Sequence, residues 1–274
     1  MSSILNNTSA TVALATLKDV NRGLNETQNR VSSGLQISSG KDNAAYFAIS
    51  ETMKGDSGMF KAINEGMTST KNSIATARLG AETVSDLAQQ MVERIAFAQS
   101  DGVNNADVQA ELTALADNMQ SAIDQATFNG DDLVSGAAAA VTVVTGVSRA
   151  GGSFATTTMS FNSVDLQAIQ TALAAIDLTT STDIAADLVT AEGQLQNAIS
   201  AATSMGVAEN AIEGQMEFVD SLTDTLDSGI SSMVDADMEE EAARLQAYQV
   251  QQQLATQSLS IANRAPQNIL SLFR

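Results

Sequence analysis

The chain contains no cysteine, no histidine and no tryptophan, and it has a single proline. Without cysteine it can form neither a disulfide nor a thiolate metal site. Without histidine it lacks the side chain that most often transfers protons near neutral pH, and every zinc motif that contains histidine. Because these absences remove the commonest catalytic and metal centres, we expect no enzyme activity, no cofactor and no bound metal.

Aromatic side chains are also scarce, at 4% of the 274 residues, although 44% of the residues are hydrophobic. This composition favours helices that pack through small side chains over a compact core built on aromatic rings. No apolar run approaches the roughly 20 residues that span a bilayer. Residues 1–8 lack the basic start and apolar stretch of a classical signal peptide. These signals taken alone predict a cytoplasmic protein with no membrane contact.

Positive charge is scarce over most of the chain. The net charge is -19, yet residues 1–60 are balanced, with five basic and five acidic side chains. The remainder carries 8 basic against 27 acidic side chains, and Arg149 is the single positive one between Arg94 and Arg244. Such a surface repels phosphate backbones, so we expect no nucleic-acid binding.

Both ends of the chain carry apolar residues at alternating steps of three and four, which places them on one side of a helix that packs on a partner. The N-terminal stripe, which Ser9 could cap, consists of Ala10, Ala13, Leu17, Val20, Leu24, Thr27 and Val31. The C-terminal stripe consists of Leu245, Tyr248, Gln252, Ala255, Leu259, Ala262, Pro266, Ile269 and Phe273. The chain ends in the apolar Leu270, Leu272 and Phe273, although chain ends usually fray into water.

The middle of the chain repeats the helical pattern. It predicts helices over about 59–98, 106–126 and 164–176, and a longest helix that begins near Asp183 and runs to Met233. After the helix predicted over 106–126, Asn129 and Gly130 indicate a turn, because both residue types tolerate positive φ.

Residues 131–162 differ in character from the helices. The runs 141–145 and 154–161 are β-branched and aromatic, and the glycine-containing segment 149–152 separates them. They predict a β-hairpin. Since two strands are not stable alone, this hairpin must rest on the helices.

The predicted fold is mainly α: a long helical bundle or coiled coil with nested N- and C-terminal helices and a small β-hairpin in the middle. The first helix pairs with the last, and the second with the fifth. We expect residues 1–45 and 235–274 to form one domain of terminal helices. Residues 46–130 and 163–234 form a second helical domain, and residues 131–162 form a surface-exposed β segment.

The terminal stripes are poor in large side chains and bury too little to offset the cost of ordering two helices. We therefore expect the ends to be disordered in a monomer and to fold against copies of the chain. Identical subunits joined through different surfaces form an open helical polymer. The expected polymerisation contacts are Leu17, Val20, Leu24, Val31, Leu245, Tyr248, Leu259, Ile269, Leu270, Leu272 and Phe273.

An acidic patch comes before the last helix, at Asp235, Asp237 and residues 239–241. Its spacing lacks the alternating ligands and central glycine of a calcium loop. Acidic residues are also favoured at a helix N-terminus by the helix dipole. We interpret the patch as a helix start.

Several segments resemble the signatures of one known family. Residues 30–45 (RVSSGLQISSGKDNAA) resemble the N-terminal signature of bacterial flagellins, and residues 127–130 lie where that family has a similar turn. Residues 234–237, 251–254 and 262–274 (ANRAPQNILSLFR) resemble the C-terminal signature. The matches cover about 100 residues at the two ends, in the family's order.

This resemblance implies a short flagellin that polymerises into the extracellular filament used for swimming. The terminal helices would line the inner tube, the next helices would form a shell, and the middle would face outward. Export would proceed through a flagellum-specific type III channel without a cleaved signal peptide, which replaces the cytoplasmic prediction. The implied partners are other flagellins, a filament cap, hook–filament junction proteins and an export chaperone.

Two properties of some flagellins, O-linked glycosylation and recognition by a Toll-like receptor, depend on particular residues of the chain. O-linked glycans, which some flagellins carry, would fall on the exposed hydroxyl groups of Thr145, Ser148, Ser153, Thr156 and Ser160. The segment that a flagellin-sensing Toll-like receptor reads is altered here, because Val92 and Ile95 stand in place of charged residues. We therefore do not carry receptor recognition over.

Two alternative functions remain at this stage. A hook–filament junction protein shares the terminal helices but stops after a single ring, so unlimited polymerisation would separate it from a flagellin. A helical signalling or binding module would need a membrane anchor or an adapter-binding tip, and neither is visible in the sequence.

Overall fold

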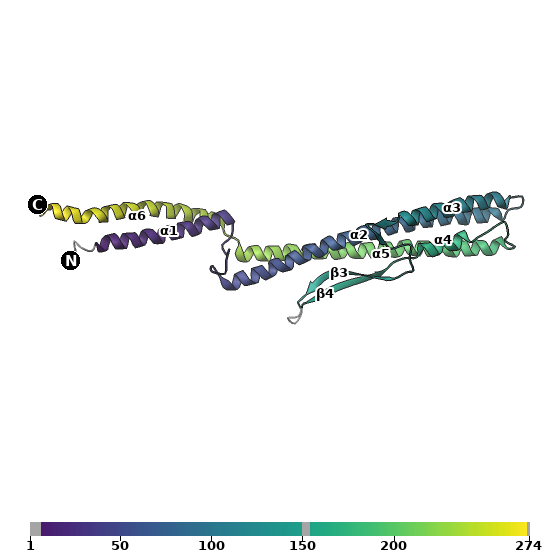
Figure 1. Ribbon diagram of the computed structural model, residues 1–274, viewed down its shortest axis with the longest axis horizontal. Helices are drawn as coiled ribbons and strands as arrows, with labels where there is room; N and C mark the ends of the chain where they lie inside the picture. The colour runs from purple at the N-terminus through teal and green to yellow at the C-terminus, as the bar shows by residue number, and fades with distance from the viewer. Residues whose placement is uncertain (1–6, 150–153, 273–274) are drawn as a thin grey trace. The chain divides into compact units, whose positions relative to one another are not determined.

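The computed structural model describes residues 7–149 and 154–272, with side chains in the last helix described as far as Arg264. Helices dominate this part of the chain and a small hairpin lies in its middle, which confirms the predicted fold class (Figure 1). Each helix within these ranges is too short or too polar to cross a lipid bilayer.

The terminal helices α1 (Thr8–Ser33) and α6 (Met238–Leu272) lie side by side and run in opposite directions (Figure 1). The Asn7 side chain accepts a hydrogen bond from the Ala10 amide at 3.1 Å and caps α1, so the prediction of Ser9 as the cap was wrong. At the other helix start, the Asp237 carboxylate accepts bonds from the amides of Glu239 and Glu240. The acidic patch therefore contains a helix cap, as interpreted from the sequence.

The two long helices are α2 (Ala44–Ala98) and α5 (Ile184–Val234). The start predicted near residue 59 was wrong, because the Asn43 side chain accepts bonds from the Ala45 and Tyr46 amides and starts the helix there. Consequently α2, with 55 residues, is longer than α5, with 51. The two helices are antiparallel, as predicted from the nested order, and Ser57 donates a 2.7 Å bond to Asp227 between them.

Shorter helices complete the core. Helices α3 (Asn105–Gln125) and α4 (Leu166–Ala174) contact each other. The side-chain nitrogen of Gln120 donates to Oε1 of Gln167 at 2.9 Å. The side chains at the centre of this region are fully buried, among them Met67, Ile74, Met91, Ile95, Met119 and Ile123. They belong to helices that the sequence predicted, over 59–98 and 106–126.

Two small antiparallel sheets follow α3. Strands β1 (Thr127–Phe128) and β2 (Asp131–Asp132) flank a tight turn in which Asn129 and Gly130 have positive φ, as their residue types predict. Strands β3 (Ala140–Ser148) and β4 (Ala155–Asn162) form the predicted hairpin. The hairpin rests on the helices, because the Gln215 side chain of α5 donates to the carbonyl of Thr145.

The chain divides into two compact units, residues 1–57 with 225–274 and residues 58–224. The division falls inside α2 and α5, at 57/58 and 224/225. Both boundaries lie nearer the middle of the chain than the predicted ones at 45/46 and 234/235. The assignment of these parts to an inner tube, a shell and an outer segment stays a prediction.

A connector of residues 34–43 joins α1 to α2 in the first unit. It begins at Gly34, whose φ of 73° suits glycine, and the amides of Gln36 and Ile37 both donate to the Val234 carbonyl. In return, the Ala236 amide donates to the Gly34 carbonyl at 2.9 Å. The end of α1 and the junction between α5 and α6 are thus fastened to each other by backbone hydrogen bonds.

Candidate assembly surface of the terminal helices

The predicted stripes of α1 and α6 face each other within one chain. Val20, Leu24 and Ala255 are buried, with exposed fractions of 8%, 9% and 8%. The other predicted contacts with described side chains are half-buried: Leu17, Val31, Leu245, Tyr248 and Leu259. We call this contact the seam. The sequence placed its members correctly on one side of each helix, and their role between subunits stays a prediction.

The side chains of four predicted contacts at the end of the chain lie outside the described part of the structure. Ile269, Leu270 and Leu272 lie in α6, but their side chains are outside the described part of the structure. Phe273 lies wholly outside the described residues.

Polar pairs bridge the seam along its length. The amide nitrogen of Asn7 donates to the Ala262 carbonyl at 2.8 Å, and that of Gln252 donates to Asn21 Oδ1 at 2.6 Å. Near the other end, Arg30 Nη1 lies 3.2 Å from Glu241 Oε1. These contacts define one antiparallel register.

Glu241 lies at the most buried end of this series. Its residue is 4% exposed, and Oε1 also accepts a 3.3 Å bond from Arg244 Nη1. Oε2 has no hydrogen-bond partner among the described residues. A buried carboxylate is stable only while its positive partners remain in place, so the seam depends on Arg30 and Arg244 at this point.

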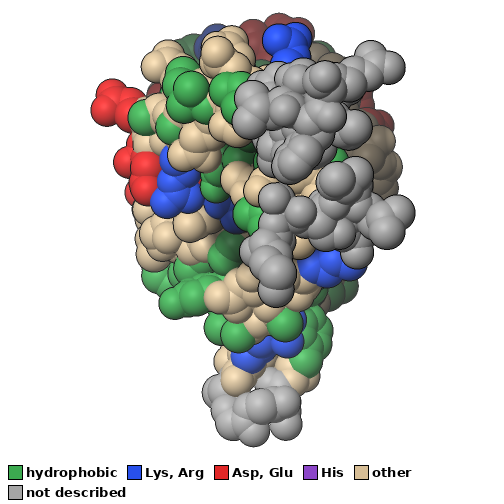
Figure 2. All heavy atoms as spheres, turned by 90° about the vertical axis from the view of Figure 1, so that its left-hand side faces the viewer, with side chains coloured by type: hydrophobic (Ala, Val, Ile, Leu, Met, Phe, Trp, Pro, Cys, Tyr) green, Lys and Arg blue, Asp and Glu red, His purple; other side chains and the backbone are tan. Residues whose placement is uncertain are grey.

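A second apolar stripe lies on the opposite side of α6. Val250, Leu254 and Ile261 follow steps of four and seven, which keep them in one line along a helix with 3.6 residues per turn. They are 55%, 57% and 65% exposed. We call them the outer stripe. Figure 2, which views the side of the molecule at which the termini lie, shows hydrophobic side chains reaching the surface between polar ones.

The two terminal helices therefore differ. The exposed surface of α1 carries Lys18, Arg22 and Glu26 along its middle and has Val12 and Leu14 exposed near its start, whereas α6 is apolar on two sides along its length. A groove of about 340 Å³ opens between the helices, and the outer-stripe residue Leu254 lines it together with Val20 and Ala255 of the seam. The stripe predicted from the sequence of α6 is the one in the seam. The outer stripe was not predicted, although its steps of four and seven residues also fit a helix.

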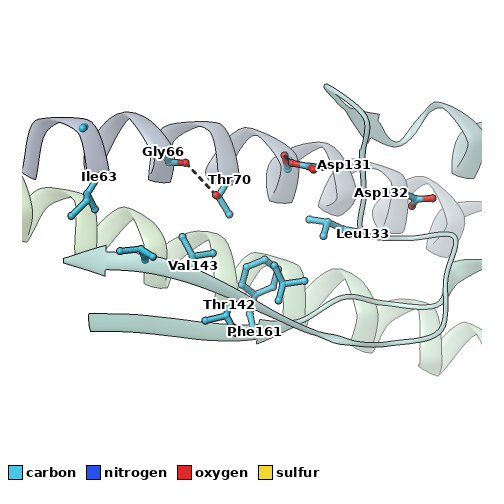
Figure 3. Close-up of a pocket in the computed structure, with 13 residues that line it drawn as sticks. Ile63, Gly66, Thr70, Asp131, Asp132, Leu133, Thr142, Val143 and Phe161 are labelled. Atoms are coloured by element: carbon cyan, nitrogen blue, oxygen red, sulfur yellow. Dashed lines mark hydrogen bonds between the residues drawn. The ribbon is translucent and has the colours of Figure 1, made fainter. Parts of the chain in front are cut away.

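The larger cavity, of about 660 Å³, lies between α2 and the hairpin (Figure 3). Ile63 and Thr70 line it from α2, and Val143 and Phe161 line it from the strands. None of the described residues that line it is basic. Its walls are mainly apolar, with polar groups at one end.

The carboxylates at that end, Asp131 and Asp132, are engaged in structural bonds. Asp131 accepts from Ser73 at 3.2 Å. Burial acts to raise the pKa of Asp132, but bonds from the Ser135 hydroxyl and the amides of Val134 and Ser135 hold that pKa below its ordinary value. The lowered pKa keeps Asp132 ionised at neutral pH, and the bonds of both carboxylates anchor the turn.

The proposed glycan acceptors occupy different positions on the hairpin. Thr156 and Ser160 are exposed, Ser148 is half-buried, and Ser153 lies outside the described residues. The expectation that Thr145 is exposed was wrong: it is 5% exposed and donates to the Thr157 carbonyl. Thr145 points inward because it shares the face of β3 that contains Val141 and Val143.

Comparisons with known proteins agree with the arrangement of the two chain ends. The chain matches the model of the bacterial flagellin N-terminal helical region over residues 4–139 and that of the C-terminal helical region over residues 188–273. It is 35% identical to a flagellin of Brucella melitensis and 32% identical to flagellin C of Rhizobium meliloti, in both cases over 100% of each chain. It is 30% identical to flagellin FljM of Caulobacter vibrioides, over 100% of this chain and 99% of that protein.

A solved structure is similar in fold. It is described as a flagellar hook-associated protein from Vibrio parahaemolyticus, and it superimposes with a TM-score of 0.54 at 13% sequence identity. The match covers 71% of this chain and 100% of that one. At this level of identity the likeness concerns the fold alone.

Proposed function

The chain belongs to the bacterial flagellin family and is a structural subunit of the flagellar filament, and we propose that the α1–α6 pair is a surface through which its copies assemble. The observation that carries this proposal is the two-sided character of α6. Its seam is covered by α1, while its outer stripe is more than half exposed among the described residues.

The outer stripe offers a favourable contact to a neighbouring subunit. Complete burial of a Val, Leu or Ile side chain contributes about 1.5–3 kcal/mol. Val250, Leu254 and Ile261 are each more than half exposed, so much of that energy is still available to a partner. A filament repeats the same contact at every subunit, so a modest gain per copy is multiplied along the polymer.

The finer organisation follows from the same proposal. The terminal helices line the inner tube, residues 46–130 and 163–234 form the shell, and residues 131–162 face outward. The seam and the chain end, including Leu270, Leu272 and Phe273, pack within this inner layer. Family membership supports this assignment, and so does the contact between α1 and α6.

We also propose the partners and the export route from family membership. Other flagellins, a filament cap, hook–filament junction proteins and an export chaperone contact the chain, which is exported through the flagellar type III channel without cleavage of a signal peptide. The flagellin relatives match over the full length of this chain, so a junction-protein function is not pursued. O-linked glycans on Ser148, Ser153, Thr156 or Ser160 stay a proposal, which an intact mass equal to that of the bare chain would refute.

The decisive experiment places a charge on the outer stripe. Leu254→Asp and Ile261→Asp are each expected to raise the critical concentration for assembly by about tenfold or more, since a tenfold change corresponds to only ~1.4 kcal/mol. Sedimentation and electron microscopy of purified protein measure this. Asn25→Asp, on the exposed side of α1, adds the same charge and should have a much smaller effect. Parent-like assembly of both stripe variants would overturn the proposal.

A further inference from the structure

The seam contains one contact that no other residue pair could make. Helix α1 has a single glycine, Gly23, and α6 has a single aromatic residue, Tyr248. The two meet: a Cβ atom placed on Gly23 would lie 2.6 Å from Cζ, 2.7 Å from Cε1 and 2.9 Å from Oη of Tyr248. The ring therefore packs directly on the backbone of α1, in space that any side chain at residue 23 would occupy.

The apolar side chains of the seam, taken without the polar pairs and the backbone bonds of the connector, specify its register weakly. The seam repeats every seven residues, and its leucines and valines alternate with four alanines, a threonine and a glutamine. A slip of one helix by seven residues would leave the two stripes facing each other. Such repeats need a separate device that excludes the alternative registers.

Tyr248 provides that device. After a seven-residue slip its ring would meet Thr16 or Arg30 in place of Gly23. Both residues carry side chains in the space that the ring occupies beside Gly23 in the native register. The native register is the one in which the single glycine receives the ring.

The buried ion pair acts in the same direction. In a slipped pair Glu241 would lose Arg30, its partner at 3.2 Å from the other helix. A buried carboxylate that loses its partner is strongly destabilising. The contact at Gly23 and the pair at Glu241 lie close along the seam, so both favour one register at the same end of the helices.

The glycine itself is costly for the helix. In a helix interior glycine is about 1 kcal/mol less favourable than alanine. At Gly214 of α5 nothing lies within 4 Å of the position that a Cβ would take, so no neighbouring side chain uses the space left by that glycine. At Gly23, by contrast, the ring of Tyr248 fills the space that a Cβ atom would occupy.

We infer that Gly23 and Tyr248 are positioning residues that fix the register of α6 on α1 and so set the level at which the outer stripe is presented to the next subunit. The inference rests on the proposed function for the meaning of that level. The register itself is a property of the chain, and it is measurable whether or not filaments form.

The absence of cysteine makes the register directly measurable. A Cys at position 21 is combined with a Cys at position 252, which reports the native register because Asn21 and Gln252 are hydrogen-bonded. Combinations of the Cys at position 21 with a Cys at position 245 or 259 report slips of seven residues in either direction. Full-length protein is treated with a short bifunctional thiol reagent, and soluble and sedimented fractions are analysed separately.

The parent should give the native product in large excess. In Tyr248→Ala and Gly23→Ala the ratio of native to slipped product should fall by about tenfold or more, because the excluded registers become accessible or the native one becomes obstructed. Tyr248→Phe keeps the ring and should behave as the parent. Gly214→Ala is the matched control for a glycine-to-alanine change and should leave the ratio unchanged.

An unchanged ratio in both Tyr248→Ala and Gly23→Ala would overturn the inference and leave the polar pairs and the backbone bonds of Gly34 and Ala236 as the source of register. If Tyr248→Ala loses helix content, Tyr248→Leu keeps apolar bulk without the ring and carries the same expectation. Sedimentation of the outer-stripe variants tests the proposed function separately. Parent-like assembly of those variants together with a shifted ratio here would refute the assembly surface and keep the register inference.

Discussion

The two compact units bury their apolar faces to different degrees. In the unit of residues 58–224, the central side chains Met67, Ile74, Met91 and Ile95 are 0% exposed. In the α1–α6 pair the best-covered apolar side chains still show 8% or 9% of their surface, and the outer stripe of α6 is more than half exposed. The unit of residues 58–224 has a fully buried core, whereas the terminal pair has one covered side and one open side.

The difference follows from residue type and from the number of neighbours. Large Met, Ile and Leu side chains fill the space where α2, α3, α4 and α5 meet, and each is covered from several directions. The seam is formed by two helices only, so its apolar side chains are covered from fewer directions. The middle of the chain therefore holds the more completely buried core, and the proposed assembly surface lies on the less covered terminal helices.

The largest expected effect tests the fully buried core. Ile95→Ala removes a fully buried side chain and should lower the free energy of unfolding of the soluble chain by about 2–5 kcal/mol. Urea denaturation followed by circular dichroism measures this. Leu24→Ala, the same kind of truncation in the seam, should change that transition far less and should impair assembly. Equal losses of unfolding free energy in the two variants would break the comparison.

A middle-sized effect is expected from the ion pair between α2 and α5. Arg78 Nε lies 2.7 Å from Glu209 Oε2, and that bond, followed by the one to Glu82, raises the pKa of Arg78 above its ordinary value. Glu209→Gln should cost about 1 kcal/mol of unfolding free energy, between the values typical of exposed and of desolvated charged bonds.

The control for this pair is Glu51→Gln. It removes the exposed partner of Lys54, 2.9 Å away on the same helix, and should change the unfolding free energy by no more than about 0.5 kcal/mol. A cost at Glu51 that matches the cost at Glu209 would show that burial between the helices does not strengthen the Arg78 pair.

The smallest effect concerns the connector. The amide of Ser38 is the main cause that holds the pKa of Asp42 below its ordinary value of 3.8, and the amide and hydroxyl of Ser39 contribute. Because the folded pKa is depressed, the contribution is complete above the unfolded pKa and is lost as the pH falls through the lower, folded pKa. The connector should therefore keep its structure down to about pH 4 and loosen below it.

Hydrogen exchange of the Ser38 and Ser39 amides checks this. Asp42→Asn should raise their exchange rates at neutral pH and remove the acid-dependent step, while the amides of the central core stay protected. Persistence of the acid step in Asp42→Asn would assign it to another group.

The seam and most helices could be predicted because a repeat of three and four residues is a local signal. The start of α2 was missed because Gly55 and Gly58 weaken the helical pattern there, although the cap at Asn43 determines where the helix begins. Thr145 was misplaced although the period-two pattern with Val143 indicates its inward direction. The outer stripe was present in the spacing and was passed over in favour of the stronger stripe.

The contact of Gly23 with Tyr248 was beyond the sequence. It depends on the register of two helices whose bonded residues, such as Asn21 and Gln252, are 231 positions apart. A heptad pattern predicts which sides of two helices meet but not which residue lies opposite which. Only the distances between the two backbones reveal that the glycine is opposite the ring.

The bond between Ser57 and Asp227 has a kinetic consequence. It joins residues 170 positions apart, and once α2 and α5 have paired there, α1 and α6 emerge from positions already held near each other. The loop-closure entropy for bringing the chain ends together has then been spent, so the late encounter of the terminal helices is effectively intramolecular, at high local concentration. Under the proposed assembly, the two ends of each subunit would pair without a long-range search.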